Sequence, residues 1–402
     1  MTPIDNAAEL VAVSEELGVK FAKTAAAVDT AGDYPSDNLA DLHDAGFSRL
    51  AVPRDLGGIA ADQLYGDLPK VTEILTNIAS GESSTAQIWM INYSVGSMLL
   101  RPSSPLSPEH RSELAQEVLR GARFCSAGAE HVKPRFSYRT TATPVEGGVI
   151  LNGTKRFATG VKGATYAITL LLHSDYESVE AGGLYNALVR LDAPGVRIID
   201  DWDNMGQRAT GSCSVELTDV FVPDGYHWAP GAKVAPHEDV SGPINQVMFA
   251  SILLGLGTGA LRAISDYLGH APAPTVADNP YDLSVVGEWQ IGQHYITLAG
   301  ARALIQQAAA GITGFTPSTD DARARVSVAM MCAKVAATEA SLEVCGDIHR
   351  MGGGRSTTRE AGLDVFWRNA RTLSTHDPQD VKKRHLGRWV LRGINPPVDA
   401  LS

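Results

Sequence analysis

The chain has 402 residues, 44% of them hydrophobic, and a formal net charge of −11 at pH 7. Its length is enough to bury a large core and predicts two or three domains. Because its Lys and Arg residues do not form clustered runs, we expect no nucleic-acid partner and favour a small-molecule ligand.

The amino terminus and the cysteines predict a cytoplasmic protein. Residues Met1 to Asp5 do not form a basic stretch followed by an apolar one, and no apolar run reaches about 18 residues, so we expect no membrane association. The spacing of the cysteines predicts neither a disulfide framework nor a zinc site, and we expect no metal. The cysteines are Cys125, Cys213, Cys332 and Cys345.

Residues 1–121 are predicted to form a helical domain. Apolar residues recur at spacings of three and four, as on one face of a helix, at Leu10, Val13, Leu17 and Phe21 and again at Leu39, Leu42 and Phe47. Proline and paired glycines between Val52 and Gly58 indicate a loop, after which the helical pattern resumes.

Residues 122–235 are predicted to form a central antiparallel β domain. Glu146-Gly147-Gly148 is typical of a tight turn and separates the Thr-rich residues 138–144 from an apolar run at 149–151, which predicts a hairpin. Further strands are expected at residues 166–172, 185–191 and 215–222. Because no helical pattern separates these strands, an antiparallel sheet or small barrel is favoured over a doubly wound fold.

Residues 236–402 are predicted to form a bundle of long helices, which makes the fold class α+β. Ser318 precedes Asp321 by three residues, as in a capping box, and the helix expected from there to Arg350 is about 50 Å long. The run from Gly255 to Ala260 imitates a dinucleotide fingerprint, but no later strand completes a βαβ unit. We therefore interpret its glycines as small residues on a packed helix and expect no nicotinamide site.

The densest group of reactive side chains lies between Arg368 and Pro378. Spacings of four place Arg368, Thr372 and His376 on one face of a predicted helix, where their side chains are able to converge on one ligand. Asp377, which is followed by a proline, is typical of a helix N-cap. A carboxylate committed to a cap makes a weak general base, whereas histidines exchange protons near neutral pH, so His376 is the preferred candidate.

Three further segments carry a family resemblance. They are Asn-Gly-Thr-Lys-Arg-Phe-Ala-Thr-Gly at 152–160, Asn-Met-Gly-Gln-Arg-Ala-Thr-Gly-Ser at 204–212 and Asp-Val-Phe-Val-Pro at 219–223. In this order, on a helix-sheet-helix chain of this length, they resemble the acyl-CoA dehydrogenase superfamily of flavoproteins. The resemblance implies an N-terminal helical domain, a central β domain, a C-terminal four-helix bundle, and usually a homotetramer in which flavin lies between subunits.

The resemblance also assigns flavin contacts. Phe157 matches an aromatic residue against the flavin, and Thr159 matches a hydroxyl that bonds the flavin near N5. Gly352 and Gly353 match a glycine-rich turn that approaches the flavin of a neighbouring subunit. Without the family context, Phe157 and Thr159 are ordinary strand residues and the glycines form a helix C-cap.

The run from Trp367 to Pro378 indicates a branch of this superfamily. Typical members carry a glutamate followed by glycine here, and the glutamate removes the α-proton of an acyl-CoA; in this chain Asp377 and Pro378 take these positions. The run instead resembles two-component flavin monooxygenases of the dibenzothiophene monooxygenase kind. That branch implies reduced FAD or FMN from a separate NAD(P)H-dependent reductase, reaction with O2 to a C4a-(hydro)peroxide, and oxygenation of a small organic substrate at carbon, nitrogen or sulfur.

Within that branch we expect His376 to hydrogen-bond the peroxide or to deprotonate the substrate. Arg368 and Thr372 are expected to position it, and also to contact the flavin and the substrate respectively. Gln87 to Tyr93 match a helix that lines the pocket, so Asn92, where relatives often carry histidine, is a second catalytic candidate and Trp89 a substrate contact. The plainer interpretation is that Trp89 and Tyr93, four residues apart, belong to the core.

Two alternatives stay open. The first is α,β-desaturation of an acyl-CoA with Asp377 as a shortened base, and the second is a non-catalytic protein that keeps the flavin fold for binding. A Gly-Ser-Asp turn that supports CoA contacts in dehydrogenases is absent after Gly128, where Glu130 stands instead, and this weakens the first alternative.

Overall fold

The computed structural model describes residues 6–62, 65–130, 138–229, 240–270, 283–315 and 319–397. The first part is helical and consists of α1 (Ala7–Ala22), α2 (Ala25–Ala31), α3 (Ser36–Asp44), α4 (Leu68–Gly81), α5 (Ser83–Leu100) and α6 (Pro108–Leu119). A short 3-10 turn, η2 (Arg54–Leu56), lies within the predicted loop, and another, η1 (Phe47–Ala51), precedes it where the sequence predicts the end of a helical run. Asn6 begins α1, because its side chain accepts hydrogen bonds from the N–H groups of Ala8 and Glu9.

Strands occupy the middle of the chain. They are β1 (Phe124–Ala127), β2 (Thr141–Val145), β3 (Gly148–Lys155), β4 (Tyr166–His173), β5 (Leu184–Arg190), β6 (Val196–Ile199), β7 (Ser214–Pro223) and β8 (His227–Trp228). The predicted hairpin is confirmed as β2 and β3, and the other predicted strands correspond to β4, β5 and β7. The sequence pattern does not predict β1, β6 or β8, because each has only two to four residues and shows no clear alternation.

The sheet has the strand order β6-β7-β3-β2-β4-β5-β8, with β1 beside β4. Most neighbouring strands are antiparallel, but β1 and β2 both run parallel to β4. The expectation of an entirely antiparallel domain was wrong in this detail. The reason is that β4 reverses direction after β3 but enters the sheet on the far side of the hairpin, next to β2.

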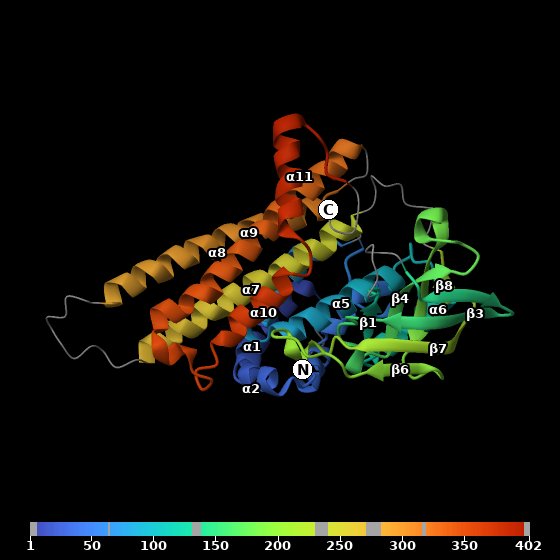
Figure 1. Cartoon of the computed structure of the whole chain (residues 1–402), viewed down its shortest axis with the longest axis horizontal. Helices are drawn as coiled ribbons and strands as arrows, with labels where there is room; N and C mark the ends of the chain where they lie inside the picture. Colours follow the sequence, from blue (N-terminus) through green and yellow to red (C-terminus); the bar gives the residue numbers. More distant parts are fainter. Residues whose placement is uncertain are drawn as a thin grey trace.

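Long helices make up the last part of the chain. α7 (Ser241–His270), α8 (Leu283–Thr313) and α9 (Asp320–Gly352) pack along one another, and α10 (Asp364–Ser374) and α11 (Gln379–Arg392) lie against this group (Figure 1). With 33 residues, α9 is about 50 Å long, as the sequence predicts. Its cap is Thr319, whose side chain accepts from the Ala322 N–H, whereas the predicted cap Ser318 lies outside the described residues.

Gly255 and Gly259 of α7 pack against α4, in agreement with the predicted role of small residues on a packed helix. A Cβ atom at Gly255 would lie 2.5 Å from the Thr76 carbonyl oxygen, and one at Gly259 would lie 2.3 Å from the Ser80 carbonyl oxygen. Only glycine allows the two backbones to approach so closely. Among the described helices, α7 alone is long and apolar enough to cross a membrane, but 83% of its apolar stretch is buried inside the protein.

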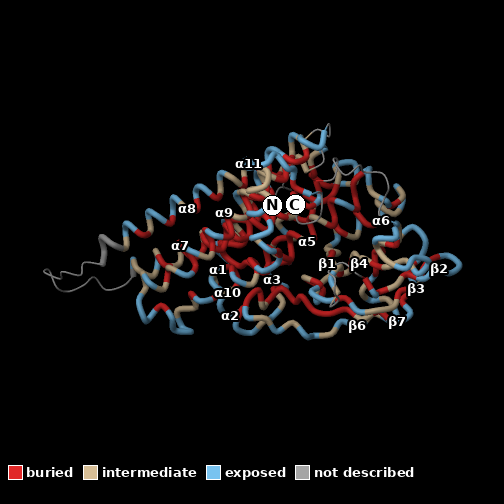
Figure 2. The backbone as a smooth tube through the Cα atoms, turned by 45° about the horizontal axis from the view of Figure 1, so that its top comes forward, coloured by how far each residue is buried: buried red, intermediate tan, exposed pale blue. Residues whose placement is uncertain are grey.

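The buried residues connect the helical part with the sheet (Figure 2). One hydrophobic cluster fills the helical part and a second fills the sheet domain. A third cluster joins α5 and α6 to the sheet and contains Val95, Leu99, Leu114, Phe124 and Tyr166. The predicted α+β class, with helices, then a sheet, then helices, is therefore confirmed, and α5 lies where the two helical parts and the sheet meet (Figure 1).

Candidate active site

Asp377 lies at the centre of a buried charge cluster between α10 and α11. One carboxylate oxygen, Oδ2, accepts a hydrogen bond from Nζ of Lys382. The other, Oδ1, lies 3.4 Å from Nζ of Lys334 and 3.5 Å from Nδ1 of His376. The side chains of Asp377 and Lys334 are completely buried. Asp377 therefore binds two lysines and orients a histidine.

The predicted N-cap role of Asp377 was wrong. Helix α11 begins after Pro378, which occupies the cap position, and none of the side chains that the structure describes caps the helix. The carboxylate turns away from the helix end because Lys334, on α9, and Lys382, one turn into α11, offer it charged partners in the interior.

The charges of the cluster determine its protonation. Burial raises the pKa of Asp377, but the adjacent His376 ring and the charges of Lys334 and Lys382 outweigh burial and hold this pKa well below its usual range. Two lysines share one carboxylate, so the cluster carries a surplus cation. Burial lowers the pKa of Lys334 to about 8, and the nearby positive charge of Lys382 acts in the same direction. The negative charge of Asp377 opposes this shift.

His376 combines an anchored nitrogen with an open one. Its side chain is 41% exposed, and its ring lies 4.2 Å from the ring of Phe249 on α7, measured between centroids. Asp377 approaches Nδ1 and thereby favours a proton on that nitrogen. Within the described part of the chain, Nε2 makes no hydrogen bond. This nitrogen is therefore available to accept or donate a proton.

The predicted convergence of Arg368, Thr372 and His376 on a helix face was wrong. Helix α10 ends at Ser374, so His376 lies in the loop beyond it, where the helical spacing no longer applies. Asp377 rather than Arg368 orients the imidazole.

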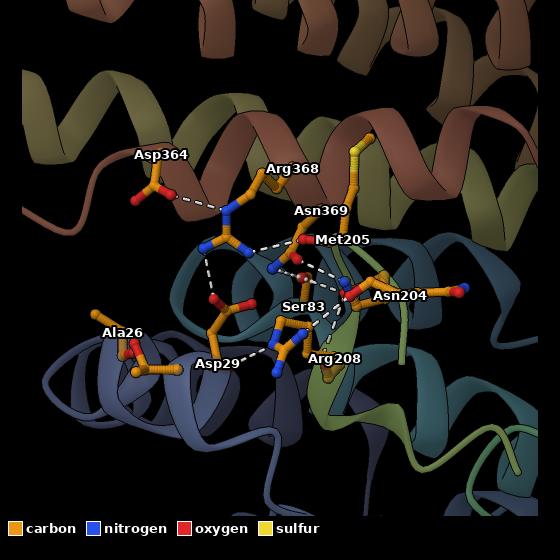
Figure 3. A network of polar contacts seen from close by, with 12 residues as sticks. Ala26, Asp29, Ser83, Asn204, Met205, Arg208, Asp364, Arg368 and Asn369 are labelled. Carbon is orange, nitrogen blue, oxygen red and sulfur yellow. Dashed lines mark hydrogen bonds and ion pairs between the residues drawn. The ribbon is translucent and has the colours of Figure 1, made fainter. Parts of the chain in front are cut away.

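Arg368 instead connects three parts of the chain (Figure 3). Its Nη2 lies 2.5 Å from Oδ2 of Asp29 on α2, its Nε lies 2.8 Å from Oδ2 of Asp364 on α10, and its Nη1 donates to the Met205 carbonyl oxygen at 2.8 Å. These contacts engage the guanidinium on three sides. They assign Arg368 to the connection of α10 with α2 and with the loop before η5 (Arg208–Thr210) rather than to a flavin.

Thr372 contacts the same loop one turn further along α10. A Cβ atom at Gly206 would lie 2.7 Å from Thr372 Oγ1 and 2.1 Å from the Arg368 carbonyl oxygen. Gly206 is therefore required for the close approach of the loop to α10. The hydroxyl of Thr372 faces Gly206, and the threonine is half-buried.

Phe157 and Thr159 lie just after β3 and offer a surface that suits a flavin. Phe157 adopts the left-handed backbone conformation, with φ +58°, and its side chain is 56% exposed. A left-handed backbone is strained for a bulky residue and is typical of functional sites, and a ligand over the exposed ring would remove its apolar surface from water. Oγ1 of Thr159 lies 3.0 Å from Oγ of Ser212 and 3.5 Å from Nε2 of Gln87. An open aromatic face beside a hydrogen-bonded hydroxyl fits the flavin ring that the sequence predicts.

Trp89 and Asn92 are committed to the interior of the helical part. Trp89 is 3% exposed, and its ring packs between Phe47 and Tyr93. The amide oxygen of Asn92 accepts from the N–H of Phe124 at 2.9 Å, which fixes β1 to α5. The cavity beside both residues has a volume of about 10 Å³, enough for roughly one water. These contacts agree with the core interpretation of this helix face, and the substrate role of Trp89 and the catalytic role of Asn92 stay predictions.

Gly352 and Gly353 form the turn at the end of α9. A Cβ atom at Gly352 would lie 2.5 Å from that of Ser356, whereas one at Gly353, which has φ +64°, would meet nothing within 4 Å among the described residues. The C-cap interpretation therefore agrees with the geometry, and the turn also leaves Gly353 open on its outer side.

Sequence reasoning missed several of these residues. Lys334 gives no local signal, because only the packing of α9 against the loop before α11 brings it to Asp377. Lys382 is close to Asp377 in sequence, but its contact depends on the carboxylate turning inward instead of capping α11. Phe249 is one apolar residue among many on α7, and nothing in its neighbourhood indicates a contact with His376. Among the described residues, no group of three or more His, Cys, Asp or Glu side chains is arranged to bind a metal ion.

Comparison with known proteins finds relatives along nearly the whole chain. Residues 134–220 match the acyl-CoA dehydrogenase middle domain, and residues 247–380 match the acyl-CoA dehydrogenase C-terminal domain. A dibenzothiophene monooxygenase of Rhodococcus qingshengii is 31% identical and covers 96% of this chain and 94% of its own. The probable FMNH2-dependent monooxygenase SfnC of Pseudomonas putida is 27% identical, with 96% and 95% covered. The crystal structure of FMN-bound TdsC from Paenibacillus sp. A11-2 has a TM-score of 0.85 and 25% identity, with 98% and 100% covered.

Proposed function

The chain belongs to the acyl-CoA dehydrogenase superfamily, in its flavin-dependent monooxygenase branch, and on that basis we propose that it oxygenates a small organic substrate with reduced flavin and O2. Reduced flavin, when bound, supplies the electrons that activate O2. The protein's own residues bind the flavin ring, exclude water and exchange a proton.

The buried state of Asp377 carries the choice between oxygenation and desaturation. A dehydrogenase needs a carboxylate at this position that is free to take an α-proton from its substrate. Asp377 instead binds Lys382 and Lys334 in the interior, and its pKa lies far below that of an effective base. These contacts favour an orienting role for Asp377 and count against the desaturation alternative.

His376 is the proposed proton-exchanging group. With Nδ1 directed to Asp377, Nε2 is left to hydrogen-bond the oxygen that is transferred or to take a proton from the substrate. The ring of Phe249 covers one face of the imidazole and limits the access of water. Arg368 and Thr372 support this arrangement indirectly, because both fix α10, which ends just before His376.

Phe157 and Thr159 are the proposed flavin contacts. The exposed ring of Phe157 provides a surface for the flavin, and the hydroxyl of Thr159 is available for a hydrogen bond to it. We favour FMN over FAD because TdsC was crystallised with FMN and SfnC is described as FMNH2-dependent. We further propose that a separate NAD(P)H-dependent reductase supplies the reduced FMN in the cytoplasm.

The proposed assembly is a homotetramer in which Gly352 and Gly353 approach the flavin of a neighbouring subunit. Support comes from an exposed apolar face on α8, where Trp289 and Tyr295 are each 68% exposed and Ile296 is 66% exposed. A large exposed apolar face on a long helix is typical of a subunit interface. Sedimentation of the purified protein tests the oligomeric state directly.

The proposed function is tested by supplying photoreduced FMN, admitting ¹⁸O2 and analysing a panel of small aromatic and organosulfur compounds that includes dibenzothiophene. We expect one ¹⁸O atom in the product and an equivalent amount of FMN oxidised. Anaerobic bleaching of bound FMN by an acyl-CoA would instead support desaturation. A chain that binds neither oxidised nor reduced FMN would support the non-catalytic alternative.

A further inference from the structure

Gln207 is buried where α5, α10 and the sheet domain meet. It lies just before η5, is 2% exposed and has a left-handed backbone with φ +52°. This conformation is unfavourable for a residue with a long side chain. Its side chain must therefore make contacts that compensate for the backbone.

All the polar atoms of Gln207 are hydrogen-bonded. The side-chain Nε2 donates to Oε1 of Gln87 at 2.9 Å, and the side-chain Oε1 accepts from Oγ of Ser83 at 2.7 Å. The backbone N–H donates to Oδ1 of Asn369 on α10 at 2.6 Å, and the carbonyl oxygen accepts from the indole of Trp202 at 2.9 Å. Such a completely paired buried group permits only one arrangement of its neighbours.

Two of these contacts lead to the residues that we propose to face the flavin. The ring of Trp202, fixed by its bond to the Gln207 carbonyl oxygen, packs edge-on against Phe157 with centroids 6.1 Å apart. The amide of Gln87, fixed by Nε2 of Gln207, directs its own Nε2 to Oγ1 of Thr159. Gln207 therefore directly contacts one neighbour of Phe157, which is Trp202, and one neighbour of Thr159, which is Gln87.

The direction of hydrogen bonding matters at Thr159. Because Gln87 accepts from Gln207 with its oxygen, it has only its N–H₂ group to offer the threonine, so the hydroxyl of Thr159 accepts there. The hydroxyl proton of Thr159 is directed to Oγ of Ser212, because Ser212 donates to Thr210 and Thr210 donates to the Gln207 carbonyl oxygen, so Thr159 keeps a lone pair that can accept a hydrogen bond from a bound flavin. A reversed Gln87 amide would accept from Thr159 and draw this proton away from Ser212.

We infer that Gln207 is a positioning residue of the flavin site, which aligns Phe157 through Trp202 and sets the donor direction of Thr159 through Gln87. This inference rests on the proposed function, because it takes Phe157 and Thr159 as flavin contacts. It adds that Asn369 couples the same residue to α10, the helix that precedes His376. Gln207 is expected to touch neither flavin nor substrate.

Two variants test the inference. Gln87→Glu keeps the size of the side chain but supplies only acceptor oxygens, so Thr159 must donate to it rather than to Ser212, which reorients the hydroxyl that faces the flavin. Gln207→Leu removes both side-chain contacts. The matched control is Gln306→Leu on α8, which loses amide bonds to Thr72 and Glu73 on α4, far along the chain from this network.

The readouts are the dissociation constant of FMN, from quenching of its fluorescence, the absorption bands of bound oxidised FMN, and the thermal unfolding temperature of the flavin-free protein. We expect both network variants to weaken FMN binding about tenfold and to shift the absorption bands, while Gln306→Leu lowers only the unfolding temperature. The inference is overturned if Gln87→Glu folds and binds FMN with the wild-type constant and spectrum. If the wild-type chain itself binds no FMN, the proposed function fails and the inference fails with it.

Discussion

Nδ1 of His376 and Oδ1 of Asp377 lie 3.5 Å apart, although the two residues are neighbours in sequence and one is exposed while the other is completely buried. The same oxygen lies 3.4 Å from the amine of Lys334. The carboxylate that orients the histidine is therefore itself paired with buried lysines. This relationship separates the orienting role from the proton-exchanging role. Asp377 orients, and His376 exchanges the proton.

Removal of the buried anion, Asp377, is expected to reduce the stability of the protein far more than removal of one buried cation, Lys334. Asp377→Asn leaves Lys334 and Lys382 buried without a counter-ion and should lower the free energy of unfolding by about 3 kcal/mol. Lys334→Met removes the surplus cation and should be neutral or stabilising. Urea denaturation measures both, with the exposed Asp380→Asn as a control expected to change stability by less than about 0.5 kcal/mol. Equal losses for Asp377→Asn and Lys334→Met would contradict the description of the cluster.

The stability of the protein should depend on Lys334 at alkaline pH. The pKa of this buried amine is about 8, below its ordinary value of about 10.4. Between these values the unfolded chain binds a proton that the folded chain does not, so the contribution of Lys334 to stability rises with pH. The free energy of unfolding of the wild type, minus that of Lys334→Met, should therefore increase by roughly 3 kcal/mol from about pH 8 to 10.5. A pH-independent difference would show that the amine titrates normally.

The contribution of Asp377 to stability should change at acidic rather than alkaline pH. Its pKa is lowered in the folded protein, so its contribution to stability is complete above the ordinary aspartate pKa of about 3.9 and is lost as the pH falls below that value. Acid unfolding of the wild type, compared with that of Asp377→Asn, isolates this contribution. We expect the two unfolding curves to converge at low pH, and curves that stay equally separated down to about pH 2 would contradict the shift.

Phe157 should matter for flavin and little for folding. Phe157→Leu keeps an apolar side chain but loses the aromatic face, and we expect the FMN dissociation constant to rise about tenfold, or about 1.4 kcal/mol. Because the ring is 56% exposed, the unfolding temperature of the flavin-free protein should hardly change. Phe157→Gly relieves the left-handed backbone and should not destabilise the protein, despite the loss of the ring. Unchanged FMN binding in Phe157→Leu would remove the ring from the site.

Arg368 should matter for folding rather than for flavin. Arg368→Met leaves Asp29 buried without its cation and should cost about 2 to 4 kcal/mol of stability. Adding Asp29→Asn should recover much of that loss, because no buried charge then remains, and a double-mutant cycle measures the recovery. If the double variant regains stability but binds FMN much more weakly than the wild type, Arg368 contacts the flavin after all.

The sequence pattern was sufficient for several local features. The hairpin of β2 and β3 follows from a glycine turn between apolar runs, and the packing role of Gly255 and Gly259 follows from the absence of a βαβ unit. The pattern failed where distant residues decide. Asp377 reads as a helix cap until Lys334, on another helix, is brought to it, and two residues of loop are enough to move His376 off the face of α10.

At the candidate site, too, the contacts between distant residues could not be predicted from the sequence. The family resemblance places Phe157 and Thr159 beside the flavin, but only coordinates reveal the left-handed backbone of Phe157 and the chain of amides behind Thr159. Spacings of four along α5 and α10 equally suit a pocket and a core. The family resemblance assigns Trp89 to the substrate, whereas its spacing of four to Tyr93 predicts a core residue, and the packing agrees with the core. Arg368, expected to face a ligand, makes ion pairs with Asp29 and Asp364.

The most direct test of the proposed chemistry is the fraction of reduced FMN oxidation that yields oxygenated product in His376→Ala, compared with the wild type and with Thr375→Ala, an exposed neighbour in the same loop. We expect the coupled fraction to fall at least tenfold in His376→Ala and hydrogen peroxide to appear instead, while the FMN dissociation constant stays within about twofold of the wild type. Wild-type coupling in His376→Ala would contradict the central role of this histidine.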